Sequence, residues 1–223
     1  MESQPAVANL ARRRRRGRRD RFGAATGAVK PHRSFDPRRV GSLECDAWVA
    51  YYRREWLKFL RAAVALTRHM FGLPWPQTVW GAWLVLRANQ LWAPYPENQP
   101  ERARAVMDRF YSLVKRRYAE PYDPAVAADL EVEWWRVHRE HQHDGAGTDE
   151  RALVAALAAL YGYVYGVAKE AVQVAAEQRA LAMRYSDQWV SEGCDLASPL
   201  IGAERAALVR SYAGLLAGVH RSG

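Results

Sequence analysis

Apolar side chains recur every three or four residues through most of positions 42–223, which is the spacing of an α-helix. No stretch alternates apolar and polar residues as a half-buried β-strand does, and no Asn-Gly pair marks a hairpin. The chain is also poor in β-branched residues, with Ile201 as its single isoleucine, while Ala, Leu and Arg are abundant. This combination predicts an all-α fold.

Helix caps and breaks divide the patterned region into separate elements. Gly72 and Pro74 end the first helix, and Gly162 and Gly166 indicate a bend or a stop near Tyr165. A region of this length suits one domain. We therefore expect a single-domain bundle of six or seven helices. The expected helices cover residues 42–71, 76–92, 98–118, 124–143, 148–165, 167–192 and 199–220.

The net positive charge lies in the first 41 residues. Residues 1–41 hold twelve Lys and Arg side chains against three Asp and Glu, a net charge of +9 that equals the +9 of the whole chain. Residues 42–223 are therefore electrically balanced. Because the first segment mixes Arg, Gly and Pro without an apolar period, we expect a disordered Arg-rich leader at residues 1–41 and an all-α domain at residues 42–223.

The leader has two interpretations. Its arginines favour weak, salt-sensitive and nonspecific binding to nucleic acid or an anionic surface through residues 12–39. Alternatively it is a solvated tail, or sequence upstream of the native start codon. Phe22 and Phe35 are its only aromatic residues, which is a poor supply of stacking surfaces for single strands.

Cysteine usage and hydropathy indicate a cytoplasmic protein without a membrane span. Cys45 and Cys194 are too few for a disulfide framework, and a reducing compartment is the simpler interpretation. No uninterrupted apolar stretch is long enough to cross a bilayer. The arginines at residues 12–16 resemble those of a twin-arginine export signal, but the residues after them are too short and too polar for its apolar region.

Residues 129–144 form the segment richest in chemistry-bearing side chains. On a helix, His141 continues the buried stripe and Glu133 lies at its edge, while His138 lies on the opposite flank. His138 and His141 are three residues apart and are candidate metal ligands, although neither the His-Glu-x-x-His nor the Glu-x-x-His pattern occurs. The more conservative interpretation is a core histidine satisfied by a neighbour.

Two charged residues interrupt apolar helical stripes. Glu55 lies on the expected stripe of the first helix, and Arg179 lies on that of the sixth. Buried charges are paired, so we expect Arg179 to meet Glu55 or Glu133 inside the bundle, either as a structural ion pair or around an anionic ligand. We expect substitution of Glu44 to have little effect.

The remaining motifs do not define a reaction. The chain has no Gly-rich phosphate loop, Cys-x-x-Cys pair or Gly-x-Ser-x-Gly elbow, and no cofactor is indicated. Trp135 projects away from the main stripe beside Val132 and is a candidate contact to another protein.

Three functions are therefore kept open. The leading hypothesis is a small helical helper or binding protein that acts through contacts with a partner or with itself. The alternative is a helical-bundle enzyme or a ligand- or metal-binding protein, with an internal polar site at Glu55, Glu133, His141 and Arg179. A weaker third is nucleic-acid binding by the tail of a dimerising body.

Overall fold

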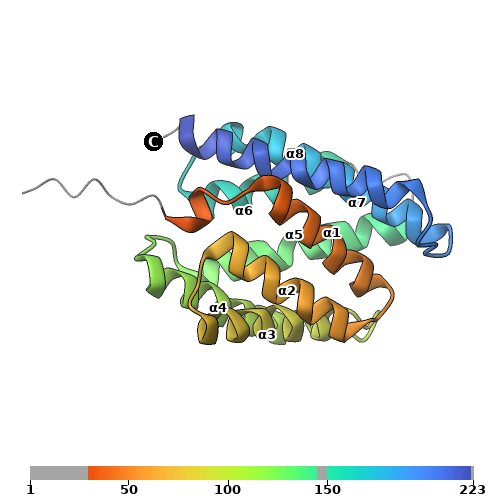
Figure 1. Cartoon of the computed structure of the whole chain (residues 1–223), viewed down its shortest axis with the longest axis horizontal. Coiled ribbons are helices and arrows are strands. Elements are labelled where there is room, and N and C mark those ends of the chain that lie inside the picture. The colour runs from red at the N-terminus through yellow and green to blue at the C-terminus, as the bar shows by residue number, and fades with distance from the viewer. Residues whose placement is uncertain (1–29, 145–149, 222–223) are drawn as a thin grey trace, which may run out of the picture.

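The computed structural model describes residues 30–144 and 150–221, and these residues form an all-α fold, as the sequence predicts (Figure 1). The described part of the chain contains eight α-helices and two short 3-10 helices. The elements in chain order are η1 (Pro31–Arg33), α1 (Pro37–Tyr52), α2 (Trp56–Phe71), α3 (Trp75–Trp92), α4 (Pro100–Tyr118), α5 (Pro124–Asp144), α6 (Glu150–Tyr165), η2 (Lys169–Val172), α7 (Gln173–Ser191) and α8 (Pro199–Arg221).

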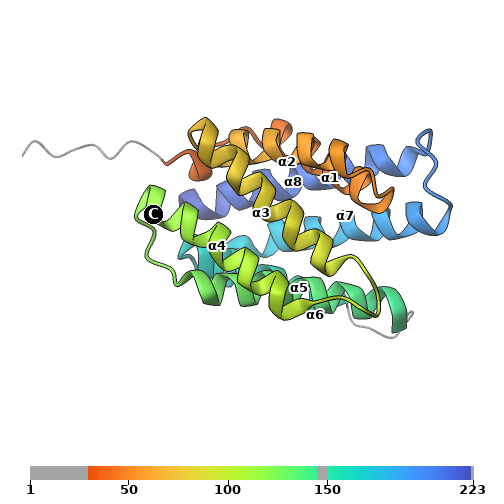
Figure 2. The same cartoon turned by 90° about the horizontal axis from the view of Figure 1, so that it is seen from below.

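The eight helices form a closed ring. Each helix packs on the helices before and after it in the chain, and α8 returns to pack along α1. In Figure 1, α7 and α8 lie on the side of the molecule opposite α2, α3 and α4, and Figure 2 shows the same helices from below. Because neighbours along the chain are also neighbours in space, short connections suffice to build the ring.

Two glycines allow α8 to close the ring. A Cβ atom on Gly41 of α1 would lie 2.7 Å from the backbone nitrogen of Val209, closer than side-chain atoms normally approach backbone. A Cβ atom on Gly218 would collide with the backbone of Ala171, just before α7. Helix α8 therefore contacts α1 and η2 at distances that only glycine permits.

The helix expected over residues 42–71 is two helices, because the chain turns at Arg54. This residue has a φ of 59°, in the left-handed region, and it separates α1 from α2. Its guanidinium lies 5.2 Å from the ring centre of Tyr51 and 5.8 Å from that of Trp56, and it donates a hydrogen bond to the carbonyl oxygen of Ala93. These tertiary contacts offset the unfavourable backbone conformation.

The folded body begins earlier than the expected boundary at residue 41. Phe35 is buried and packs edge-on against Tyr212 of α8, with ring centroids 5.5 Å apart. The buried carboxylate of Glu120 pairs with Arg33 at 3.2 Å and also with Lys30. The segment before α1 is thus part of the core, and the rest of the predicted leader lies outside the described residues.

None of the described helices is, by itself, both long and apolar enough to cross a bilayer. The pair formed by residues 150–165 and 169–191 reaches the required length and apolarity only together, and it is bent by 109°.

Candidate functional site

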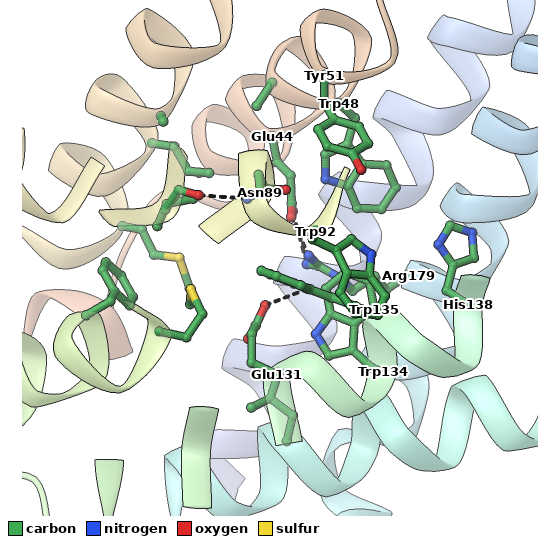
Figure 3. Close-up of a pocket in the computed structure, with 18 of the residues that line it drawn as sticks. Glu44, Trp48, Tyr51, Asn89, Trp92, Glu131, Trp134, Trp135, His138 and Arg179 are labelled. Atoms are coloured by element: carbon green, nitrogen blue, oxygen red, sulfur yellow. Dashed lines mark hydrogen bonds and ion pairs between the residues drawn. The ribbon is translucent and has the colours of Figure 1, made fainter. Parts of the chain in front are cut away.

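A cavity of about 560 Å³ lies inside the ring. All eight helices contribute side chains to its wall, and aromatic rings dominate the part drawn in Figure 3. One wall residue from each helix, in chain order, is Glu44, Phe59, Val85, Met107, Glu131, Tyr161, Arg179 and Tyr212. Because every helix takes part, the cavity follows directly from the closure of the ring.

A buried ion pair joins α1 and α7 at the cavity wall. Arg179 donates through Nη1 to Glu44 at 3.1 Å and through Nη2 to the other carboxylate oxygen. The guanidinium carbon also lies 5.4 Å from the ring centre of Trp48 and 5.3 Å from that of Trp134. Burial alone would lower the pKa of Arg179, but the adjacent Glu44 carboxylate holds it well above its usual value. Arg179 is therefore a fixed cation between two indole rings.

Glu131 is a second carboxylate at the same wall. It accepts hydrogen bonds from the Tyr111 hydroxyl at 2.7 Å and from the Trp135 indole nitrogen at 3.2 Å. Burial raises the pKa of Glu131, and the Tyr111 hydrogen bond and the positive charge of Arg179 oppose that rise. The accessible surface that Glu131 retains borders the cavity. The site thus combines one cation, two carboxylates and several indole rings.

Three buried hydrogen-bond donors at the cavity make no hydrogen bond of regular geometry among the described residues, although Glu131 lies close to one of them and Ser211 to another. They are the Arg179 Nε, the Trp134 indole nitrogen and the Tyr161 hydroxyl. Burial raises the pKa of Tyr161, while the nearby Arg179 charge lowers it. Buried polar groups without a partner are rare in native proteins, since each costs roughly 1–3 kcal/mol. Neighbouring protein atoms cover all three donors, so an acceptor atom inside the cavity would reach them only after a small shift of the surrounding side chains.

Polar side chains from α1, α5 and α7 surround one end of the cavity. His138 lies 3.0 Å from Asp187, and Gln142 donates to Asp187 at 2.6 Å and to the Tyr52 hydroxyl at 3.2 Å. Gln142 is exposed and also lines the cavity. This end of the cavity therefore reaches the protein surface.

Two of the predicted inward carboxylates face outward instead. Glu55 precedes α2 and pairs with Lys58 at 2.8 Å and with Arg53 at 3.3 Å, because the turn between α1 and α2 rotates it off the apolar stripe. The side chain of Glu133 is 43% exposed and pairs with Arg136 on the same helix. The predicted pairing of Arg179 with Glu55 or Glu133 is therefore wrong, although Arg179 is buried as expected.

Glu44, whose substitution the sequence predicts to have little effect, is the buried partner of Arg179 in the structure. Trp135 was a candidate for a contact with another protein, but it is buried and packs against Trp92 at a centroid distance of 5.8 Å. Val132 beside it is fully buried. Helix α5 buries two of its faces, because it lies between α4 and α6 and also borders the cavity.

The two candidate metal ligands on α5 have different surroundings. His138 is bound to Asp187 at the rim, while His141 is half-buried and does not line the cavity. In the part of the chain that the structure describes, no group of three His, Cys, Asp or Glu side chains could hold a metal ion.

One signal in the sequence could have located Glu44. It precedes Trp48 by one helical turn, so the two residues share the face that lines the cavity. Glu131 has the same spacing to Trp135, and it accepts a hydrogen bond from the indole nitrogen of that residue. A carboxylate one turn before a buried tryptophan is thus a common feature of both residues.

No protein-family model, curated protein or solved structure matches this chain.

Proposed function

We propose that this protein binds one small molecule inside the ring of helices, with an apolar aromatic or aliphatic body and a single hydrogen-bond acceptor. The observation that carries this proposal is the cavity of about 560 Å³ itself, beside which the donors of Trp134, Tyr161 and Arg179 make no hydrogen bond of regular geometry. An acceptor atom at this position would satisfy groups that otherwise destabilise the fold.

The size and lining of the cavity support a small organic ligand. Ligand pockets have volumes of roughly 300–1,000 Å³ and mostly apolar walls with a few polar groups, and this cavity of about 560 Å³ is lined in that way. Apolar wall residues such as Phe59, Met107 and Phe110 would contact the body of the ligand, and the Arg179 region would orient it.

The charges of the site favour a neutral ligand. The Arg179 cation is already balanced by Glu44, and Glu131 adds a second carboxylate nearby. An anionic ligand would therefore bring an uncompensated charge into a buried site, which is costly. A carbonyl, ether or hydroxyl oxygen would accept from the free donors without that cost.

The test is a fluorescence titration with prodan, a neutral naphthalene dye that carries one carbonyl acceptor. Ala63 lines the cavity and is buried, so Ala63→Phe fills part of the volume. Ala105→Phe on the exposed side of α4 is the matched control. We expect saturable binding of one dye, weakened about tenfold or more by Ala63→Phe and unchanged by Ala105→Phe. Circular dichroism confirms that each variant is folded.

Equal dye affinity of the parent and the Ala63→Phe protein would contradict the proposal, because it would place the dye outside the ring. The function of a helper protein that acts through protein contacts, and the cytoplasmic location, stay predictions.

A further inference from the structure

Helix α3 carries a row of large apolar side chains that point away from the molecule. Trp75 is 61% exposed, Val79 52%, Trp80 49% and Trp83 45%, and we call these four residues the tryptophan face. At 100° per residue they occupy the outward side of the helix. Helix α3 runs along the lower edge of the molecule in Figure 1 and faces the viewer in Figure 2.

Helices α2 and α3 carry positive charge without negative charge of their own, although Glu55, just before α2, pairs with Lys58. Residues 56–92, which include α2 and α3, contain four Lys and Arg side chains and no Asp or Glu. The Arg68 guanidinium carbon lies 5.4 Å from the ring centre of Trp75, so the cations adjoin the indoles directly. This asymmetry stands out because residues 42–223 as a whole are electrically balanced.

Helix α4 provides a second basic border. Three of its exposed arginines are spaced seven residues apart and therefore lie on one line along the helix; they are Arg102, Arg109 and Arg116. Phe110 and Leu113 of the same helix pack at Gly81 of α3, so this line adjoins α3. The α4 carboxylate of Glu101 lies on the other side, where Arg104 bridges it to Asp129 of α5.

We propose that the tryptophan face docks on an anionic lipid bilayer. Tryptophan concentrates at the boundary between headgroups and acyl chains, and aliphatic side chains beside it partition into the same layer. Val79 fits that environment, whereas it offers nothing to a nucleic-acid phosphate. The arginines of α2 and α4 lie where they meet lipid phosphates. The proposal does not depend on what the internal cavity binds.

The first test is a matched pair of single substitutions in the full chain. Val79→Glu places a negative charge at the centre of the tryptophan face, and Val174→Glu places one on α7, where the valine is 58% exposed. Sedimentation uses phosphatidylcholine vesicles with and without about a third phosphatidylglycerol. We expect binding only to the anionic vesicles, reduced about tenfold or more by Val79→Glu and unchanged by Val174→Glu.

A second set of variants identifies the contributing groups. The triple change Trp75→Ser, Trp80→Ser and Trp83→Ser should also reduce vesicle binding, while the control triple Val174→Ser, Val190→Ser and Leu196→Ser should not. Replacing Arg109 and Arg116 by Gln should weaken binding more than replacing Lys169 and Arg221. Thermal melts show whether each variant is folded.

Two results would overturn the proposal. In the first, the Val79→Glu protein binds vesicles as well as the parent, and changing the arginines at residues 12–16 to Gln abolishes binding. That result would place the affinity in the N-terminal segment. The other is a loss, on Val79→Glu, of binding to a single-stranded oligonucleotide but not to vesicles, which would make the tryptophan face a nucleic-acid surface.

Discussion

At the scale of single residues, Arg179 connects the fold to the cavity. Its fork-shaped guanidinium makes two hydrogen bonds to Glu44 and lies between the rings of Trp48 and Trp134, while its Nε lacks a partner among the described residues. A buried ion pair adds little net stability, but removal of one partner leaves an uncompensated charge in the interior. The pair therefore fixes the position of the donors more than it stabilises the protein.

Glu44→Gln should therefore lower the free energy of unfolding by about 3 kcal/mol, because the Arg179 charge would stay buried without its counter-ion. Glu55→Gln is the matched control and should change little, since Glu55 pairs at the surface. The double variant Glu44→Gln, Arg179→Met should recover part of the loss. Urea unfolding measures all three, and equal stability of Glu44→Gln and Glu55→Gln would contradict the assigned roles.

Glu204 gives the chain a distinct pH dependence. It is fully buried on α8 near Cys45 and Ser186, and burial raises its pKa from the ordinary 4.5 to about 7. The folded carboxyl therefore keeps its proton at pH values where the unfolded one has lost it. Stability from this group is complete below pH 4.5 and falls as pH rises to about 7, by about 3 kcal/mol.

Glu204→Gln should remove this slope, because the amide does not ionise. The measurement is the unfolding free energy of the parent and the variant across the same pH range. Desolvation lowers the pKa of the buried His32 to about 4, so the stability that this histidine contributes is lost as pH falls. Because both proteins contain His32, its effect cancels in the comparison. Parallel curves for the two proteins would show that folding does not raise the pKa of Glu204.

At the scale of elements, the segment before α1 belongs to the folded body. His32 and Phe35 are buried there, and Lys30 and Arg33 neutralise the buried Glu120. The backbone oxygen of Arg33 also accepts from His220 near the end of α8, at 2.7 Å. This segment thus connects the start of α1 to the end of α8.

Deleting residues 1–38 should therefore lower the melting temperature by about 5 °C or more, since it strips Phe35 from the core and leaves Glu120 buried without its cations. Deleting residues 1–29 keeps all of these contacts and should leave the melting temperature nearly unchanged. Equal melting temperatures for the two truncated proteins would show that the segment contributes no stability.

The sequence predicts the helices well where caps or glycines mark their ends. The helix expected at residues 76–92 is α3, and the expected stop near Tyr165 is where α6 ends, followed by Gly166 with a φ of 65°. The sequence does not predict the break at Arg54, because it contains neither Gly nor Pro. Contacts with Tyr51, Trp56 and Ala93 stabilise this break, and they form only in the folded ring.

The site is predicted less well, because its partners come from distant parts of the chain. Arg179 is recognisable as a charge on an apolar stripe, but its partner Glu44 lies 135 positions away, and helical spacing does not identify such pairs. Because the sequence does not reveal the turn at Arg54, a continuous helical projection places Glu55 on an apolar stripe. In the structure Glu55 does not occupy that stripe. Tertiary contacts, not local patterns, select these residues.

At the scale of the whole molecule, closure of the ring makes an interior that eight helices share. We propose separate functions for two surfaces: the cavity wall around Arg179 binds a neutral ligand, and the tryptophan face of α3 binds an anionic bilayer. Because the face points outward and the cavity lies inside, substitutions at Val79 should leave the prodan affinity unchanged.

The central claim is that the unpartnered donors at the cavity serve a ligand, and prodan binding to Tyr161→Phe tests it most directly. The lost hydroxyl makes no hydrogen bond of regular geometry among the described residues, so without dye the variant should be about as stable as the parent. Dye affinity should nevertheless fall about fivefold, the equivalent of one hydrogen bond. Tyr163→Phe is the control: its hydroxyl accepts from the Asp123 amide at 2.9 Å away from the cavity, so stability should fall and affinity should not. Unchanged prodan affinity in Tyr161→Phe would contradict the account.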